Sequence, residues 1–138
     1  MSDEKKPLIL IVDRDLETLT SLDSLLSREG YRVSTCSSSA EALKAVAGQK
    51  IDLVIAGRSG SERNGAILVA KIKTLSPETS VLILVEPNDD SIVADAIAAG
   101  ADGLLRRSYS EGQVFQRVER LLGVVHASDH VSLSKEIA

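Results

Sequence analysis

The sequence predicts a doubly wound α/β fold, in which a five-stranded parallel sheet carries helices on both faces as a three-layer α/β/α sandwich. Five short apolar segments recur along the 138 residues, and the segments between them place apolar residues at helical spacing. Strands that alternate with helices through short connections form parallel sheets covered on both sides. The predicted strands are residues 8–12, 31–36, 51–56, 81–85 and 103–106.

The first quarter of the chain already shows the strand–helix alternation. "LILIV" at 8–12 is apolar throughout, as is typical of a strand that is buried on both faces. The helix that follows has leucines along one stripe from Leu16 to Leu26, and Gly30 is a natural stop for it. "YRVSTC" at 31–36 alternates between polar and apolar residues, which favours a strand nearer the edge of the sheet.

Two helices begin with capping-box patterns. Ser38 with Glu41 predicts the start of the helix over "AEALKAVA", which Gly48 closes. Ser110 with Gln113 predicts the start of the last helix, whose apolar stripe runs to residue 122.

The remaining helices lie between the third, fourth and fifth strands. A helix is predicted over 65–75, and it stops before the Ser76-Pro77 pair because the residue before a proline disfavours helical geometry. An alanine-rich helix follows over 92–99 and ends at Gly100.

Length and composition predict one domain over residues 8–122, an N-terminal tail over 1–7, and a C-terminal tail or linker over 123–138. The net charge of −4 gives no attraction to nucleic acid or to an anionic membrane. No apolar run is long enough for a membrane span, and the charged N-terminus lacks an apolar signal core. We therefore expect a cytoplasmic protein without nucleic-acid or membrane partners.

Three stretches carry a resemblance to one family. "ILIVDRD" at the first strand, "DLVIA" with a later "NG" at the third, and "AIAAGADGLLRR" into the fifth resemble the receiver domains of bacterial two-component response regulators. The resemblance covers residues 8–122 and is closest to chemotaxis-regulator-like receivers. It implies the flavodoxin-like strand order 2-1-3-4-5.

The resemblance also implies a phosphorelay pocket at the strand tips. In such domains an aspartate that ends the third strand accepts a phosphoryl group, and two acidic residues after the first strand help to hold Mg²⁺. A hydroxyl residue that ends the fourth strand and a lysine after the fifth bind the phosphoryl oxygens. An aromatic residue in the fifth strand moves with them.

In this sequence the pocket is degenerate. Its positions are occupied by Asp13, Arg14, Gly57, Val85, Leu104 and Arg107, of which only Asp13 matches the family. Glycine offers no nucleophile, and a guanidinium stands where the second carboxylate would be. Asp52 opens the third strand at its opposite end, so it is no substitute. We expect no catalytic residue, no enzymatic activity, no cofactor and no bound Mg²⁺, with Asp13 as the single candidate metal ligand.

The sequence therefore indicates a pseudo-receiver, a two-component signalling module that acts by phosphorylation-independent protein–protein interaction. The resemblance implies a partner surface on the fourth helix, fifth strand and fifth helix, where Ala94, Ala98, Arg106 and Tyr109 are the candidate contact residues. It implies other signalling proteins as partners, such as a histidine kinase or an output protein, and it allows a homodimer.

The alternative is a small-anion or nucleotide sensor that uses an arginine-rich rim, since guanidinium groups suit phosphate geometry. The rim consists of Arg14, Arg58, Arg63, Arg106 and Arg107. Against it, "DRDLET" after the first strand has no glycine-rich phosphate loop. The simpler interpretation pairs the rim with Asp13, Glu62 and Glu86 as a partly neutralised surface.

Overall fold

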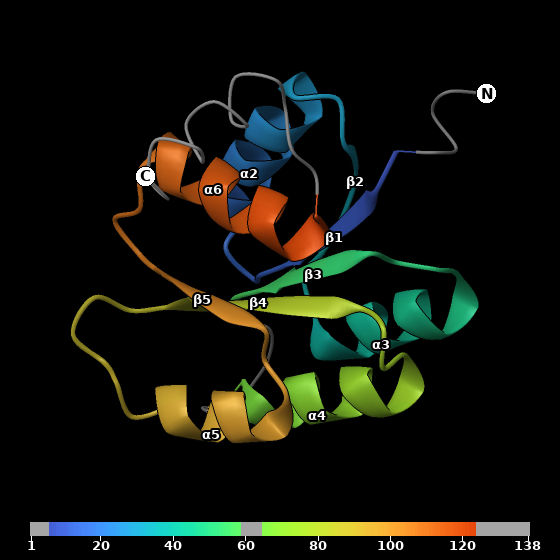
Figure 1. The fold of residues 1–138 in the computed structure, drawn as a ribbon, viewed down its shortest axis with the longest axis vertical. Helices are drawn as coiled ribbons and strands as arrows, with labels where there is room; N and C mark the ends of the chain where they lie inside the picture. Colours follow the sequence, from blue (N-terminus) through green and yellow to red (C-terminus); the bar gives the residue numbers. More distant parts are fainter. Residues whose placement is uncertain (1–5, 59–64, 124–138) are drawn as a thin grey trace, which may run out of the picture.

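The computed structural model describes residues 6–58 and 65–123, so most of the two predicted tails lies outside the described residues. Within these ranges it contains five strands and five helices (Figure 1). The strands are β1 (Leu8–Val12), β2 (Arg32–Cys36), β3 (Leu53–Ala56), β4 (Ser80–Val85) and β5 (Gly103–Arg106). The helices are α2 (Leu16–Arg28), α3 (Ser39–Gly48), α4 (Ala66–Leu75), α5 (Val93–Ala99) and α6 (Glu111–Leu122). No helix in the described ranges is both long and apolar enough to cross a membrane.

The strands form one parallel sheet in the order β2-β1-β3-β4-β5, which confirms the predicted fold. β1 lies between β2 and β3, and Ile11 is in register with Thr35 on one side and Ile55 on the other. Every residue of β1 and β3 is buried, because helices cover both faces of these central strands. β2 lies at the edge, where Arg32 and Thr35 are exposed.

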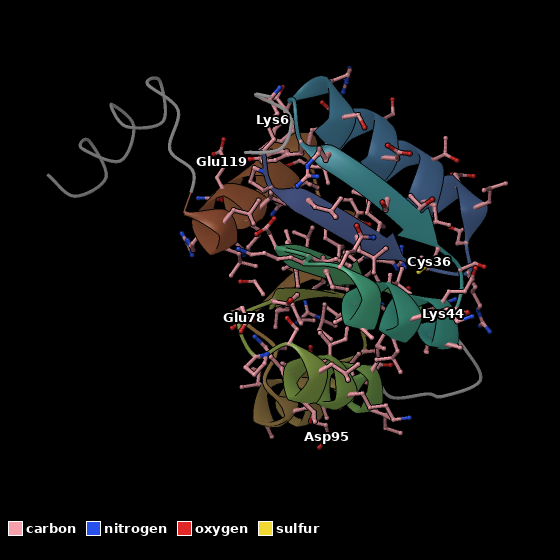
Figure 2. The ribbon with its side chains drawn as sticks, turned by 90° about the vertical axis from the view of Figure 1, so that its right-hand side faces the viewer. Lys6, Cys36, Lys44, Glu78, Asp95 and Glu119 are labelled. Carbon is pink, nitrogen blue, oxygen red and sulfur yellow. The ribbon has the colours of Figure 1, made fainter. Side chains whose placement is uncertain are left out.

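The helices form two layers, with α2 and α6 on one face of the sheet and α3, α4 and α5 on the other (Figures 1 and 2). The pleat divides the apolar side chains between two cores, since successive residues of a strand point to opposite faces. Ile9 and Ile11 pack with the leucines of α2 and the valines of α6. Leu10 and Val12 pack with the inner residues of α3, α4 and α5.

The two predicted capping boxes have different outcomes. The box at α6 is confirmed, because Ser110 accepts from the Gln113 N–H while the Gln113 side chain accepts from the Ser110 N–H. At α3 the Ser38 hydroxyl accepts from the Glu41 N–H at 3.2 Å, as predicted. The Glu41 carboxylate, however, accepts from the N–H of Ser37 rather than from that of Ser38.

Helix α5 is the least anchored of the described helices. It has seven residues, its N-cap Ile92 makes no side-chain hydrogen bond, and Ala96 is its buried residue. Gly100 ends it in the left-handed region, with φ 113°, which glycine adopts without steric cost. The expected stop is therefore confirmed, although the helix begins one residue later than predicted.

Carboxylates at the amino-terminal end of the sheet accept backbone N–H groups near the starts of strands. Asp52 Oδ2 accepts from the Leu8 N–H at 2.8 Å, so this residue lies at the end of β3 opposite to Gly57, as predicted. Asp102 Oδ2 accepts from the Val81 N–H at 2.8 Å and lies 2.7 Å from Lys73 Nζ. Each carboxylate thus supplies an acceptor where the strand ladder leaves a donor unpaired.

Candidate functional site

The candidate site lies at the carboxyl-terminal edge of the sheet, where the parallel strands end together. Asp13 follows β1, Gly57 follows β3, Glu86 follows β4 and Arg107 follows β5. In open α/β sheets this edge is the usual place for ligand sites. The fold therefore brings together four chain positions that are far apart in the sequence.

Arg107 connects three of the surrounding elements. Its Nη2 donates to Asp13 Oδ2 at 2.7 Å, its Nε to Glu86 Oε2 at 2.7 Å, and its Nη1 to Thr18 Oγ1 at 3.2 Å. All three guanidinium nitrogens thus have acceptors in the protein. We call Arg107 with Asp13, Glu86 and Thr18 the Arg107 network.

Asp13 lies at the centre of this network and has no solvent exposure, while the Arg107 side chain is 20% exposed. Its second oxygen, Oδ1, accepts from the Asp15 N–H at 2.8 Å. Burial alone would lower the pKa of Arg107, but the hydrogen bond and charge of Asp13, together with those of Glu86, raise that pKa above its ordinary value. Arg107 is therefore a permanent positive charge beside a buried carboxylate.

Gly57 lies against the Asp13 carboxylate. Its N–H donates to the Val12 carbonyl at 2.8 Å, which fixes the backbone at the end of β3. A Cβ added at this position would overlap Asp13 Oδ2, would lie 2.9 Å from Asp13 Cγ and would lie 3.2 Å from Arg107 Nη2. The carboxylate therefore fills the space that a side chain at position 57 would need.

The two residues after Asp13, Arg14 and Asp15, make hydrogen bonds to the neighbouring backbone and at the start of α2. The Arg14 N–H donates to the Arg58 carbonyl at 2.6 Å, and the Arg14 side chain is exposed. Asp15 is the N-cap of α2, where its carboxylate accepts from the Glu17 N–H and from the Thr18 hydroxyl. The Thr18 hydrogen bond lowers the pKa of Asp15.

The two apolar positions of the predicted pocket belong to the core. Val85 is buried, and its carbonyl accepts from the Arg107 N–H at 2.7 Å. Leu104 is half-buried and packs on the core beneath α3, α4 and α5. Neither side chain offers a polar atom to a ligand.

A divalent cation does not fit this set of donors. Mg²⁺ is usually held by one or two carboxylates together with water and phosphate oxygens. Both oxygens of Asp13 already accept hydrogen bonds, one of them from a cation. In the part of the chain that the structure describes, no three His, Cys, Asp or Glu residues are grouped for metal binding.

Three of the described rim arginines, Arg58, Arg106 and Arg107, lie close to carboxylates. Arg58 Nη2 is 3.1 Å from Glu86 Oε2, and Arg106 Nη2 is 2.8 Å from Asp90 Oδ1. The expected pairing of Arg107 with Asp13 and Glu86 is present. Glu62 and Arg63 lie outside the described residues.

The candidate partner residues do not share one surface. Ala94 and Ala98 are exposed on α5, and Arg106 is exposed at the end of β5. Tyr109, in contrast, is half-buried beside α2 and α6. The chain turns after β5 toward the face of the sheet that α2 and α6 cover, so Tyr109 lies apart from the exposed residues of α5. A contact between Tyr109 and a partner stays a prediction.

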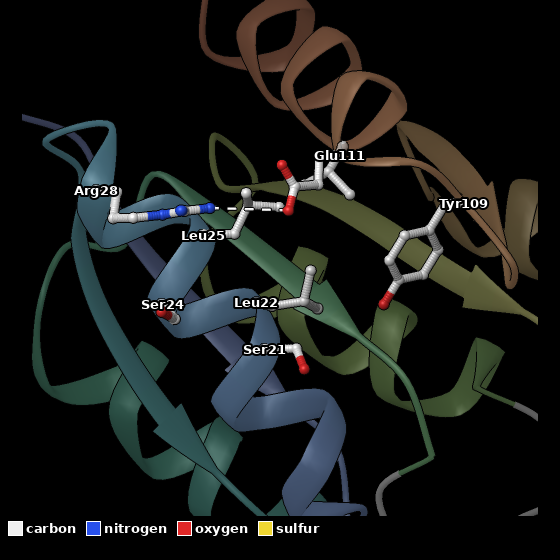
Figure 3. A pocket seen from close by; sticks show the side chains of 8 residues that line it. Ser21, Leu22, Ser24, Leu25, Arg28, Tyr109 and Glu111 are labelled. Atoms are coloured by element: carbon white, nitrogen blue, oxygen red, sulfur yellow. Dashed lines mark ion pairs between the residues drawn. The ribbon is translucent and has the colours of Figure 1, made fainter.

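Tyr109 lines a groove of about 330 Å³ between α2 and α6, which the sequence interpretation missed (Figure 3). The groove is lined by Ser21, Leu22, Ser24, Leu25, Arg28, Tyr109, Glu111 and Val114. Arg28 and Glu111 face each other across it at 3.8 Å. Burial raises the pKa of the Tyr109 phenol. The apolar stripes of α2 and α6 predict that one face of each helix is buried. The sequence holds no direct signal for a groove between the two helices.

Ser108 joins Arg107 to Tyr109 with φ 75°, the one left-handed conformation outside glycine among the described residues. A residue with a Cβ meets steric strain in this region. The flanking residues are both packed, Arg107 in its network and Tyr109 beside α2. The strain is thus located in the connection between β5 and α6.

Comparison with known proteins gives the family. The sequence model of the response regulator receiver domain matches residues 9–119. The transcriptional regulatory protein ZraR of Escherichia coli K12 is 31% identical over 121 residues, which are 88% of this chain and 27% of that protein. GlrR of the same organism is 32% identical over 117 residues, or 83% of this chain and 26% of that protein. The chain thus spans about a quarter of these curated relatives.

Solved structures agree in fold. The signal receiver domain of an HD domain-containing protein from Pseudomonas fluorescens Pf-5 superposes with a TM-score of 0.80 at 25% identity, covering 94% of this chain and 93% of that one. The chemotaxis protein CheY4 of Vibrio cholerae superposes with a TM-score of 0.77 at 22% identity, covering 85% of this chain and 99% of that one. With its sheet order and the match over residues 9–119, the chain belongs to the response regulator receiver domain family.

Proposed function

We propose that this receiver domain is a pseudo-receiver, which signals by protein–protein interaction without phosphorylation of its own pocket. The observation that supports this most is the carboxyl-terminal tip of β3. Gly57 offers no nucleophile there, and the space beside it holds the Asp13 carboxylate. We expect no enzymatic activity, because Gly57 offers no side chain that could act as a nucleophile at the tip of β3.

The surface formed by α5 and the end of β5 is the proposed contact region. Ala94 and Ala98 present small side chains to solvent, which would allow close approach of a partner. Arg106, at the end of β5, is oriented by Asp90 and by the carbonyls of Glu86 and Pro87. We propose a histidine kinase, an output protein or a second copy of this chain as the partner class.

The anion-sensor alternative has less support from the geometry. An anion at the pocket would compete with Asp13 and Glu86 for Arg107, whose three nitrogens already donate to protein acceptors. It would also approach a buried carboxylate, which repels it. A thermal-shift series with nucleotides and inorganic phosphate separates the two functions, because only the sensor predicts stabilisation.

A phosphodonor experiment tests the absence of phosphorylation. The protein is incubated with acetyl phosphate and Mg²⁺ for intact-mass measurement, and with beryllofluoride and Mg²⁺ for amide NMR spectra. We expect no adduct and no shifts, while a receiver with an aspartate at the equivalent position serves as positive control. A phosphate adduct on this chain would contradict the proposal.

A pair of alanine variants tests the contact surface. Ala98→Arg on α5 should abolish co-purification of the partner, because the bulky charge prevents close packing. Ala47→Arg is the matched control, since Ala47 is an exposed alanine in the last turn of α3. Equal partner recovery with both variants would show that the surface of α5 is not used.

A further inference from the structure

We propose that Asp13, Gly57 and Arg107 form one coupled unit, in which the Arg107 guanidinium takes the place of the divalent cation and holds Asp13 in the side-chain space of position 57. This inference rests on the proposed function and deepens it. It makes glycine a requirement at position 57. It also implies that an aspartate returned to this position cannot restore the pocket while Arg107 is present.

A side chain at position 57 would meet a steric obstacle. The Cβ of any residue at position 57 would overlap Asp13 Oδ2 and approach Asp13 Cγ to 2.9 Å. The backbone of Gly57 is not in the left-handed region, so a side chain there meets a neighbour rather than a forbidden φ. The main obstacle is therefore the Asp13 carboxylate, and Arg107 Nη2 at 3.2 Å is a second, weaker one.

Two hydrogen bonds hold the Asp13 carboxylate in this position. Asp13 Oδ1 accepts from the Asp15 N–H at 2.8 Å, and Oδ2 accepts from Arg107 Nη2 at 2.7 Å. Rotation of the carboxylate would give up one or both bonds in a site without solvent exposure. An unpaired charge in such a site is costly. Asp13 is thus held against Gly57 from two sides.

The Arg107 guanidinium is itself held in one orientation. Its Nε and Nη1 donate to Glu86 and Thr18, which fixes the plane of the guanidinium while Nη2 faces Asp13. A lysine has a single charged group and lacks this planar fork, so it cannot hold all three acceptors at once. Arginine at position 107 thus holds Asp13 in the space beside position 57, and glycine is the residue that leaves this space free.

A double-mutant cycle on folding stability tests the coupling without phosphodonor or partner. The variants are Gly57→Ala, Asp13→Ala and the double variant, with urea unfolding as the readout. We expect Gly57→Ala to lower the folding equilibrium constant about tenfold or more in the natural background, as overpacking does. We expect little further loss in the Asp13→Ala background, where the obstacle is gone.

Gly48→Ala is the matched control, because a Cβ there meets nothing within 4 Å and the backbone is not left-handed. We expect it to leave the equilibrium constant unchanged or to raise it. An equal loss from Gly57→Ala with and without Asp13 would overturn the coupling. That result would leave the phosphodonor experiment unaffected, so the two proposals fail separately.

A Mg²⁺ titration tests the role of Arg107. Arg14→Asp/Gly57→Asp returns the carboxylates and keeps Arg107, and a third variant adds Arg107→Lys to these two changes. Amide NMR shifts with Mg²⁺ are expected only for the variant that carries the lysine. An equal response of both variants, or no response of either, would overturn the assignment of Arg107 as the substitute for the cation.

Discussion

At the amino-terminal end of the sheet Asp52 and Asp102 each accept a hydrogen bond from a backbone N–H near the start of a strand. At the carboxyl-terminal end, in contrast, Asp13 accepts a hydrogen bond from the guanidinium of Arg107, the residue after β5. The first arrangement satisfies donors that the fold itself leaves unpaired. The second places the buried Asp13 carboxylate against the Arg107 guanidinium, while Asp13 Oδ1 also accepts from the Asp15 N–H. The two ends therefore differ in the burial of the charge, since Asp13 has no solvent exposure and Asp102 is 36% exposed.

The largest expected effect comes from removing the cation of the pocket. Arg107→Met keeps an unbranched apolar stem but removes the guanidinium, which leaves Asp13 as an uncompensated buried charge. We expect the free energy of unfolding to fall by about 3–5 kcal/mol, the usual cost of breaking one partner out of a buried pair. Urea denaturation at neutral pH measures it.

Lys73→Met is the matched control at the opposite end, where Lys73 pairs with Asp102. Asp102 is 36% exposed and keeps the Val81 N–H, so we expect a loss of about 1 kcal/mol. An equal loss in the free energy of unfolding for Arg107→Met and Lys73→Met would contradict the proposed difference between the two ends of the sheet.

A smaller effect is expected when an amino-terminal carboxylate is removed. Asp52→Ala leaves the Leu8 N–H without its acceptor, which should lower the free energy of unfolding by about 1–3 kcal/mol. Asp52→Asn retains an oxygen that can accept this bond and should lose less. If both variants were equally unstable, charge rather than hydrogen bonding would explain the role of Asp52.

The connection after Arg107 should gain stability from a glycine. Ser108→Gly relieves the left-handed strain at φ 75°, so we expect the free energy of unfolding to rise by about 0.5–1 kcal/mol. Ser108→Ala keeps a Cβ and should leave stability nearly unchanged. Thermal unfolding of the three proteins side by side checks the prediction, and destabilisation by glycine would contradict it.

Cys36 also lies at the carboxyl-terminal end of the sheet, but it takes part in no charge pair. We expect its effect on the free energy of unfolding at neutral pH to be the smallest of those considered. Burial, with a contribution from the charge of Glu41, raises the pKa of the Cys36 thiol to about 11. Because the folded-state pKa lies above the unfolded value, this group's contribution to stability is complete below about pH 9 and is lost as the pH rises toward 11.

Alkylation measures this difference. At pH 8 the folded protein should react with iodoacetamide about a hundredfold more slowly than the urea-unfolded chain, which follows from the lower thiolate fraction. Intact mass over time gives both rates. Equal rates would mean that Cys36 (labelled in Figure 2) is more accessible than its surroundings indicate.

The fold could be predicted from the sequence because its signals are local. The run at 8–12 is apolar throughout, and the β1 strand it predicts is buried along its whole length. The predicted ends of strands were less accurate where tertiary packing determines them. Tyr31 was expected in β2, but it turns into the core beside α2 and the strand begins at Arg32.

The pocket could be predicted in its positions but not in its contacts. Strand order places the residues after β1 and β5 at one edge, so the approach of Asp13 and Arg107 follows from topology. That Asp13 fills the space beside Gly57 depends on side-chain directions, which no spacing in the sequence specifies. Tyr109 follows Ser108, whose left-handed backbone no glycine in the sequence signals.

The short α5 has a consequence for dynamics. α2 buries five side chains over 13 residues, while α5 buries Ala96 alone over seven. Segments with few buried contacts open at lower free energy than the rest of a domain. Amide hydrogen exchange in α5 should therefore proceed through local opening, well before global unfolding. A partner bound at Ala94 and Ala98 would slow this exchange. The exchange rate of the α5 amides would therefore measure how much of the protein is bound to the partner.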